Sequence, residues 1–274
     1  MAIITLSRGT YSGAKELAEY IARNNGYKLL SREKLLDELG QNGWGDKKLS
    51  RVRQKRLSIT QSMNLEWIHY LACLRATLSE AARDEALVYY GDNGHLVLRG
   101  FPHILSIKVI ANMEDRIKII MARNEYAIDR KEAIKILNRL DERRERWSKF
   151  LYQTDANDVS SFDIVIDLSR KSIPDAYEMI HSTVSLPQFQ PTSESKKSIE
   201  DLTLAAGLRA KIAMETDIID DEIEVQIHEG MLIVKGAVHS REEANKLNKF
   251  LSSQPEVSSI ESHLEESPQT ANGV

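Results

Sequence analysis

The segment Gly9-Thr10-Tyr11-Ser12-Gly13-Ala14-Lys15-Glu16 carries residue types that can hold a phosphate. It follows the apolar run Ala2 to Leu6 and precedes a helical pattern, so it is predicted to join a strand to a helix. Backbone N–H groups and the helix dipole at such a junction attract anions. The segment keeps the first glycine and the lysine of the pattern GxxxxGK[ST], but Ala14 and Glu16 replace its second glycine and its hydroxyl. A glycine-containing turn with a surface lysine remains the alternative interpretation.

The elements that would position this loop alternate over the first two thirds of the chain. Short apolar runs predict strands, and apolar residues that recur three or four positions apart predict helices. The predicted strands are 2–6, 27–30, 95–98, 107–111 and 162–166, and the predicted helices are one that Gly26 closes and those at 31–39, 58–86, 114–124, 129–150 and 172–183. This alternation is typical of an α/β fold, in which helices flank a parallel sheet.

A change of composition after the last of these helices predicts a domain boundary. Prolines and hydroxyl residues follow one another there without periodicity, which is typical of a linker. The polar end of the chain is also without periodicity and is predicted to be disordered. The expected division is an α/β domain at 1–184, a linker at 185–197, a second domain at 198–265 and a disordered tail at 266–274.

The second domain is predicted to be a small α+β unit. Ser198 and Ser240 each precede an acidic residue three positions further on, which is the spacing of a helix capping box. Between these two helices, alternating strands at 223–227 and 232–238 are joined by a glycine turn, and a last strand is expected at 257–264. The resulting order of elements is αββαβ.

Composition argues against several classes of function. The chain of 274 residues has a formal net charge of -4 and a pI near 6.0, so we expect no DNA binding. Its 7 histidines and 1 cysteine stand in no metal-binding spacing, which argues against a zinc site built by the protein. A dinucleotide enzyme would carry G-x-G-x-x-G, which the loop lacks. The basic run 47–56 could touch RNA or a phosphate, but such a run is more often a solvated helix face.

The sequence predicts a cytoplasmic protein. Cys73 is the single cysteine and lies in an apolar helical pattern, where it cannot form an internal disulfide. The N-terminal residues lack the basic and apolar regions of an export signal. No window reaches the roughly 18 apolar residues of a membrane-spanning helix, so we expect no membrane span.

Several blocks, taken in order over about residues 1 to 183, resemble the cytidylate-kinase-like family. ITLSRGTYSGAKELAEYIA is similar to the family opening ITISR-x-x-GSGG-R-E-IA, and GYKLLSREKL resembles GYPYYDRE-L. HLVLRGFPHIL resembles VIVGRGA-x-x-L, and DERRERWSKFLYQTDANDVSSFDIVIDLSR resembles D-x-x-R-x-x-Y…D-x-x-x-YDLVI-x-TDR. Departures at Ser31, Leu98 and Ala14-Lys15 leave the acceptor substrate open.

This resemblance implies a P-loop kinase-like sheet and phosphoryl transfer from ATP, with Mg²⁺, to a nucleoside monophosphate. Such transfer needs positive charge aimed at the oxygen atoms that gain charge in the transition state. The implied roles are phosphate binding for Lys15 and for the backbone of Gly9, Thr10, Tyr11, Ser12, Gly13 and Ala14, acceptor binding for Arg32 and Arg99, and a closing lid with Arg143 and Arg144.

The sequence supports a functional role for these arginines to different degrees. Arg99 follows the predicted strand 95–98, and open parallel sheets bind ligands at the carboxyl ends of their strands. Arg32 lies in a short loop, where an arginine is often merely exposed. Arg143 and Arg144 lie in a charged helix whose own i,i+4 pairs equally favour a solvated surface.

The C-terminal segment VQIHEGMLIVKGAVHSREEANKL resembles BON domains through Gly230, Gly236 and Ser240. This resemblance implies a non-catalytic module that binds an unknown small ligand or protein, or that associates with itself in a homo-oligomer. The leading hypothesis is an ATP-dependent nucleoside monophosphate kinase with a regulatory second domain. A non-catalytic nucleotide-binding regulator and a scaffold that binds no nucleotide are the alternatives.

Overall fold

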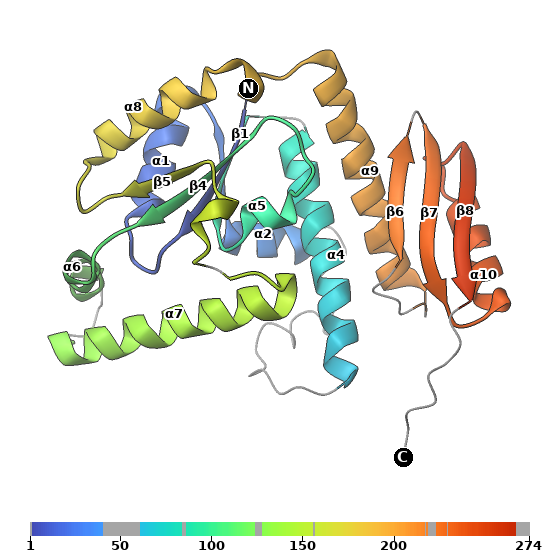
Figure 1. The fold of residues 1–274 in the computed structure, drawn as a ribbon, viewed down its shortest axis with the longest axis horizontal. Coiled ribbons are helices and arrows are strands. Elements are labelled where there is room, and N and C mark those ends of the chain that lie inside the picture. The colour runs from blue at the N-terminus through green and yellow to red at the C-terminus, as the bar shows by residue number, and fades with distance from the viewer. Residues whose placement is uncertain are drawn as a thin grey trace. The chain divides into compact units, whose positions relative to one another are not determined.

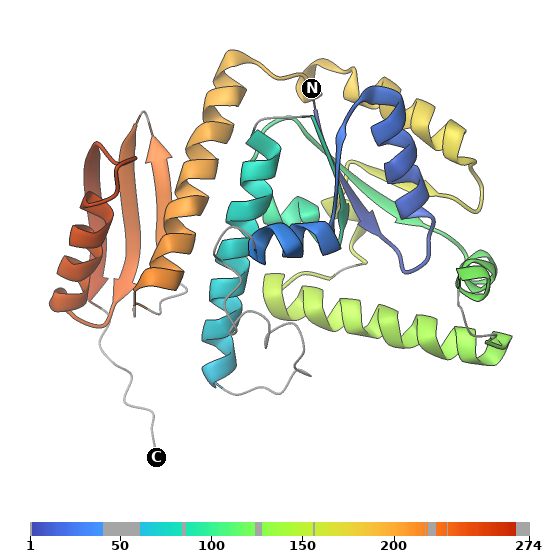
Figure 2. The same ribbon diagram turned by 180° about the vertical axis from the view of Figure 1, so that it is seen from behind.

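The computed structural model describes residues 2–40, 61–83, 86–123, 128–155, 157–216, 218, 223–228 and 230–266. Its contacts divide the chain into two compact units, Met1–Leu35 with Asp84–Ser195 and Leu36–Arg83 with Lys196–Val274. Figures 1 and 2 show the elements of both units from opposite sides. In the described part of the chain, no helix is long and apolar enough to cross a membrane.

The first unit contains a five-stranded parallel sheet in the order β2-β3-β1-β4-β5. Its strands are β1 (Ile3–Arg8), β2 (Lys28–Ser31), β3 (Leu87–Gly91), β4 (Ile104–Ile110) and β5 (Ile164–Asp167). The predicted α/β fold is therefore confirmed. In a parallel sheet all carboxyl ends meet at one edge, so the segments that follow β1, β2 and β3 lie side by side.

Two helices pack on one face of this sheet, α1 (Ala14–Asn25) and α8 (Ile173–Val184) (Figures 1 and 2). Leu17 and Ile180 share one buried cluster with Leu6 and Ile107 of the central strands. Burying each of these side chains contributes about 1.5–3 kcal/mol. α8 begins at the predicted capping box, in which the Ser172 hydroxyl accepts a hydrogen bond from the backbone of Asp175.

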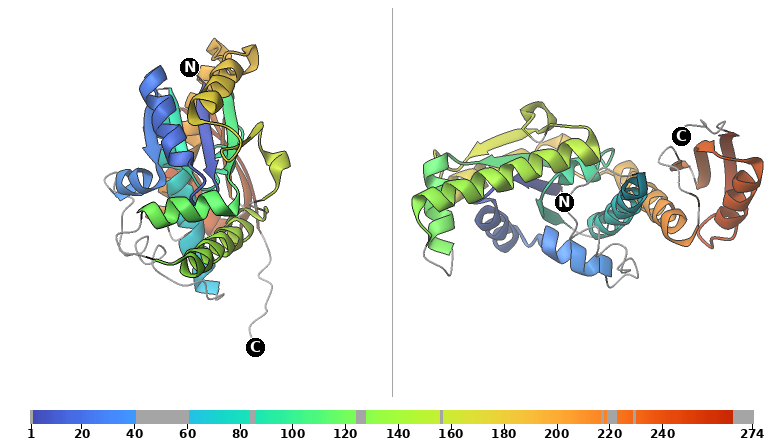
Figure 3. Two further views of the ribbon diagram at one scale, coloured as in Figure 1. Left: turned by 90° about the vertical axis from the view of Figure 1, so that its left-hand side faces the viewer. Right: turned by 90° about the horizontal axis from the view of Figure 1, so that it is seen from below.

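Two helices between β4 and β5 lie near the carboxyl edge of the sheet, α6 (Met113–Arg123) and α7 (Arg130–Tyr152). Asp129 caps α7 and accepts a hydrogen bond from Glu132 N at 2.7 Å. Figure 3 shows α7 running across the strand ends when the unit is seen from below. A 3-10 turn, Val159–Ser161, leads on to β5. The charged face of α7 is thereby placed over the loops of the sheet edge.

The predicted strand at 95–98 is wrong. That run forms the short helix α5 (Gly94–Val97), and the strand lies before the Gly-Asp-Asn-Gly turn, as β3. Periodicity cannot separate a short buried strand from a short helix when both are apolar. The chain then returns to the opposite sheet edge, where His103 O accepts a hydrogen bond from Ile3 N at 3.1 Å. Arg99 lies on this return and not at the carboxyl end of a strand.

The second unit has a three-stranded sheet in the order β6-β7-β8, where β6 pairs antiparallel and β8 parallel with β7. The helices α9 and α10 pack on one face of it, because Leu208 and Leu247 join Leu232 and Val234 in one buried cluster. This confirms the predicted αββαβ order. Its elements are α4 (Gln61–Arg83), α9 (Ser193–Glu215), β6 (Glu224–His228), β7 (Met231–Val238), α10 (Arg241–Ser252) and β8 (Ser259–Glu266).

The boundary between the units differs from the predicted one. α9 begins at Ser193, so the end of the predicted linker is helical, and Pro187–Phe189 forms a 3-10 turn. α4 belongs to the second unit, where the Thr203 hydroxyl of α9 donates to Ser79 O of α4 at 3.4 Å. A helical period predicts a buried face but not the element that covers it. Independent folding of 1–184 stays a prediction. The basic run 47–56 and the tail beyond Glu266 lie outside the described residues.

Candidate functional site

The loop between β1 and α1 turns tightly against β4. Gly9 N donates to Val109 O at 2.8 Å, and Ser12 N donates to Gly9 O at 3.1 Å. Gly13 caps α1 with a left-handed φ of 85°. A Cβ at this position would lie 2.9 Å from Leu168 Cδ1, so a side chain does not fit without displacement. The first amides of α1 have no partner within the helix, and such amides attract anions.

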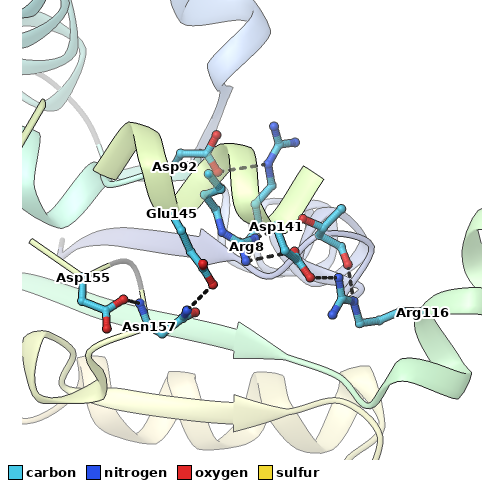
Figure 4. A network of polar contacts seen from close by, with 9 residues as sticks. Arg8, Asp92, Arg116, Asp141, Glu145, Asp155 and Asn157 are labelled. Atoms are coloured by element: carbon cyan, nitrogen blue, oxygen red, sulfur yellow. Dashed lines mark hydrogen bonds and ion pairs between the residues drawn. The ribbon is translucent and has the colours of Figure 1, made fainter. Parts of the chain in front are cut away.

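Two arginines hold this loop from the side. Arg144 of α7 donates to Arg8 O at 2.8 Å and to the Thr10 hydroxyl at 3.2 Å. Arg116 of α6 donates to Thr10 O at 2.7 Å. The carboxylate of Asp141 contacts both guanidinium groups, at 2.6 Å from Arg116 and 3.1 Å from Arg144. Figure 4 shows Asp141 facing Arg116. Because all these contacts are made within the protein, the two positive charges are fixed in place beside the loop.

The first turn of α1 carries Lys15, which the loop shares with GxxxxGK[ST], and Glu16, which departs from that pattern. Lys15 Nζ lies 3.8 Å from Glu19 Oε1, one turn further along the helix, and its side chain is about half exposed. Glu16 forms an ion pair with Arg123, whose guanidinium lies 5.9 Å from the ring centroid of Tyr11. The ion pair of Lys15 with Glu19 is therefore formed within α1.

A charged cluster lies at the carboxyl ends of three adjacent strands. Arg8 ends β1, Arg32 follows β2 as the first residue of α2 (Arg32–Leu39), and Asp92 follows β3. Asp92 lies 3.8 Å from Arg8 and 3.5 Å from Arg32, and Glu33 lies 3.6 Å from Arg8. Burial raises the pKa of Glu33, but a hydrogen bond to its own backbone and the Arg8 charge outweigh this and lower the pKa. We call these four residues the Asp92 cluster.

A second polar cluster lies partly buried beside β1 and β4. Ser7 Oγ lies 3.3 Å from His95 Nδ1, and the His95 ring packs at 4.3 Å between centroids on Phe162. Lys108 Nζ lies 5.4 Å from the centroid of the Phe162 ring, and this lysine is only 8% exposed. Burial and then the Arg144 charge lower the pKa of Lys108, while nearby carboxylates oppose the shift. Figure 4 shows Asn157 between two of these carboxylates, donating hydrogen bonds to Asp155 and to Glu145.

The partly buried imidazole of His95 predicts a loss of stability in acid. Burial and then the Lys108 charge lower the pKa of His95 from 6.5 to about 4. The unfolded chain therefore takes up a proton before the folded protein does, and stability falls as the pH drops from about 6.5 towards 4. We expect a loss of about 1.4 kcal/mol per pH unit, or ~3 kcal/mol in all. Thermal unfolding of the protein and of His95→Gln between pH 4 and 7 measures it, because the variant lacks this contribution. Parallel profiles would contradict it.

The structure brings together only part of the predicted site. Arg144 contacts the loop through Arg8 O and the Thr10 hydroxyl, and Arg32 lies in the Asp92 cluster. Arg143 is on the exposed side of α7, and Arg99 is exposed after α5. The functional roles of all these residues stay predictions, but the strand that supported Arg99 is not there.

Sequence reasoning missed Arg116, Asp92 and the cluster around His95. The sequence of α6 contains no motif that indicates a role for Arg116, because the partner of its ion pair, Asp141, lies on α7. Asp141 itself does lie in a motif, since Asp141 and Arg144 are the D-x-x-R of the family block quoted above. The run HLVLRGF, which resembles the block VIVGRGA, forms most of α5 and the turn after it and not a strand. The strand that ends on glycine here is β3, and Asp92 directly follows this glycine.

The loop has groups that fit a nucleotide phosphate. Ser12 is 2% exposed, and in the described part of the chain its hydroxyl has no hydrogen-bond partner, so a ligand oxygen can supply one. The described residues contain no group of three or more His, Cys, Asp or Glu side chains that could hold a metal. Mg²⁺ commonly binds through substrate phosphates with few protein ligands, so it would arrive here with the nucleotide.

Residues 3–170 match the family model of the cytidylate kinase-like family. The chain belongs to this family. Among solved structures, an uncharacterized protein from Eubacterium ventriosum ATCC 27560 is similar at 21% identity and a TM-score of 0.51, over 67% of this chain and 98% of that chain. A shikimate kinase from Bacteroides thetaiotaomicron is similar at 10% identity and a TM-score of 0.43, over 68% and 99%. No curated protein matches the chain.

The cytidylate kinase-like match ends within the first unit. The part of the second unit that carries β6, β7 and β8 lies outside the match, whereas α4 of that unit lies within it. The BON resemblance stays a prediction. The similarity to the Eubacterium ventriosum protein concerns the fold alone at this level of identity.

Proposed function

We propose that this cytidylate kinase-like protein transfers the γ-phosphoryl group of ATP to a small acceptor. The observation that carries the proposal is the pair of arginines, Arg116 and Arg144, fixed by Asp141 against the loop that opens α1. Phosphoryl transfer needs positive charge that is already in position when charge develops on the phosphate oxygens. The loop amides and the Ser12 hydroxyl would bind the ATP phosphates, and Mg²⁺ would neutralise part of their charge.

The acceptor would bind next to ATP, at the carboxyl ends of β2 and β3. Arg32 directly follows β2 and would contact this acceptor. The family resemblance implies a nucleoside monophosphate, so cytidylate is the first acceptor to test. The second unit would bind a further ligand or protein, or a second copy of the chain, and so regulate the reaction. We place the protein in the cytoplasm, where its buried free thiol, Cys73, stays reduced.

A second candidate function is nucleotide binding without transfer. It is favoured by Glu16, which replaces the hydroxyl that holds Mg²⁺ in GxxxxGK[ST] and which forms an ion pair with Arg123. A loop of this kind could bind ATP and signal its presence to the second unit. The two candidates differ in turnover and not in binding.

The test combines ATP binding with turnover in Lys15→Ala. We expect ATP with Mg²⁺ to raise the melting temperature of the wild-type protein, because selective binding stabilises the folded state by RT ln(1 + [L]/Kd). Lys15→Ala should lose at least about tenfold in ATP affinity and all measurable ADP release, since a positive charge at the phosphates is lost.

Glu19→Gln is the matched control, because it removes the helical partner of Lys15 and leaves the lysine charge in place. We expect it to bind ATP as the wild-type protein does. Wild-type affinity in Lys15→Ala would show that this lysine is an ordinary surface residue. ATP stabilisation without ADP release for any acceptor would favour the regulator, and an absence of stabilisation would contradict both candidates.

A further inference from the structure

The charges at the ends of β1, β2 and β3 restrict what can bind there. In the Asp92 cluster, the carboxylate of Asp92 lies between the guanidinium groups of Arg8 and Arg32, at 3.8 and 3.5 Å. The carboxylate of Glu33 lies 3.6 Å from Arg8. Two arginines and two carboxylates give a formal charge of zero. Groups of the chain itself therefore already neutralise the positive charge that an incoming anion would need.

A small molecule can nevertheless reach this cluster. The side chains of Arg8, Arg32 and Asp92 are 32%, 36% and 26% exposed. The cluster also adjoins the phosphate loop, because Arg8 directly precedes Gly9 and its carbonyl oxygen accepts a hydrogen bond from Arg144 at 2.8 Å. A molecule bound at Asp92 is thus next to the loop that would hold ATP.

We propose that Asp92 determines specificity, by selecting an acceptor that offers a free hydroxyl group and rejecting one that offers a phosphate group there. The inference rests on the phosphotransferase function proposed above and names its acceptor class, a neutral small molecule with several hydroxyl groups. A phosphate that approaches Arg8 and Arg32 meets the Asp92 carboxylate, and like charges repel at such distances. A hydroxyl group instead donates a hydrogen bond to that carboxylate.

The position of Asp92 in the chain supports this assignment. In the family block quoted above an arginine follows a glycine, and in this chain Asp92 directly follows the glycine that ends β3. An arginine there would give the cluster a third positive charge, whereas Asp92 brings the formal charge of the cluster to zero. The acceptor inferred from the charges therefore differs from the nucleoside monophosphate that the resemblance implies.

The experiment uses pairs of molecules that differ only in a phosphate group, cytidine with cytidine monophosphate and glucose with glucose 6-phosphate. Binding to the full-length protein is measured by calorimetric titration, and transfer is measured as ADP release from ATP with Mg²⁺. Inorganic phosphate is titrated separately, without ATP. We expect the wild-type protein to prefer the unphosphorylated member of each pair. We expect Asp92→Asn to bind cytidine monophosphate and inorganic phosphate at least tenfold more tightly than the wild type.

Two controls separate a local effect from a general effect of charge. Glu33→Gln changes the net charge by the same amount, but the Glu33 side chain is 63% exposed, so solvent screens its charge and we expect less than a threefold gain. Adding Arg32→Gln to Asp92→Asn should abolish the gain, because one of the two guanidinium groups that would meet the phosphate is removed. If the melting temperature shows that Asp92→Asn is unfolded, Asp92→Ser replaces it.

The inference is overturned if the wild-type protein prefers cytidine monophosphate to cytidine, or if phosphate affinity is the same in Asp92→Asn and in the wild type. An equal gain in Glu33→Gln would also overturn it, because the effect would then be a general one. The phosphate titration contains no nucleotide, so it tests the cluster even in a protein that does not bind ATP. Failure to bind ATP would refute the proposed function and leave the result on Asp92 standing.

Discussion

Arg144→Met is expected to lower kcat/KM for phosphoryl transfer by about two to three orders of magnitude. The guanidinium of Arg144 donates to Arg8 O and to the Thr10 hydroxyl, and it is held there by Asp141. The variant removes a positive charge and two hydrogen bonds from the loop at once. Asp141 is not left as an unpaired carboxylate, because Arg116 still contacts it at 2.6 Å. We therefore expect the fold to survive and the loss to fall on transfer.

Arg143→Met is the matched control, with the same change of charge and size on the same helix. Arg143 lies on the exposed side of α7, so we expect this variant to keep kcat/KM within about threefold. Steady-state kinetics and melting temperatures of both variants decide the matter. Equal losses in the two would assign the effect to the general charge of α7. A loss confined to Arg143→Met would support the exposed arginine as the lid residue and contradict the role of the contacts at Arg144.

Elements with a chemical signal at their ends could be predicted closely from the sequence. α8 starts at the capping box of Ser172, and α1 ends at Gly26, which has a left-handed φ of 68°. At such ends the residue type satisfies a backbone requirement locally, so no knowledge of distant contacts is needed. The αββαβ order of the second unit followed from the same kinds of signal.

The error at β3 and α5 has a physical cause. Leu87–Gly91 and the apolar run at 95–98 are both short, and a turn separates them. By its sequence, either run could have formed the buried strand. The run at 87–91 is the one that forms it, because it pairs with both β1 and β2. The choice thus depended on partners far away in the chain. The same holds for α4, whose apolar face gave no indication that α9 would cover it.

The site could be predicted only where its residues follow one another in the chain. The loop at 9–15 was found because its glycines and its lysine lie within seven residues of one another. Arg8, Arg32 and Asp92 meet because three parallel strands end at one edge, and their spacing along the chain contains no sign of it. Arg116 reaches the loop from a helix that carries no motif. Positions of this kind become visible only when the register of the sheet is known.

Gly13→Ala is expected to weaken ATP binding about 10- to 100-fold while the rest of the protein stays folded. Gly13 has a φ of 85°, in which an L-residue is strained. Its new Cβ would also lie 2.9 Å from Leu168 Cδ1, so the loop must shift to relieve the clash. Returning the loop to the arrangement that receives phosphate then costs about 1.4–2.8 kcal/mol, which corresponds to that loss of affinity. Calorimetric titration with ATP and Mg²⁺ measures it.

Gly26→Ala provides the matched control, because Gly26 also has a left-handed backbone, with a φ of 68°, but has open space around the position of a Cβ. It should lower the free energy of unfolding by about 1 kcal/mol and leave ATP affinity unchanged. Adding Leu168→Ala to Gly13→Ala removes the clash and should restore part of the affinity, which separates the steric contribution from the backbone strain. Wild-type ATP affinity in Gly13→Ala, or an equal loss in Gly26→Ala, would show that the left-handed turn at Gly13 does not shape a phosphate site.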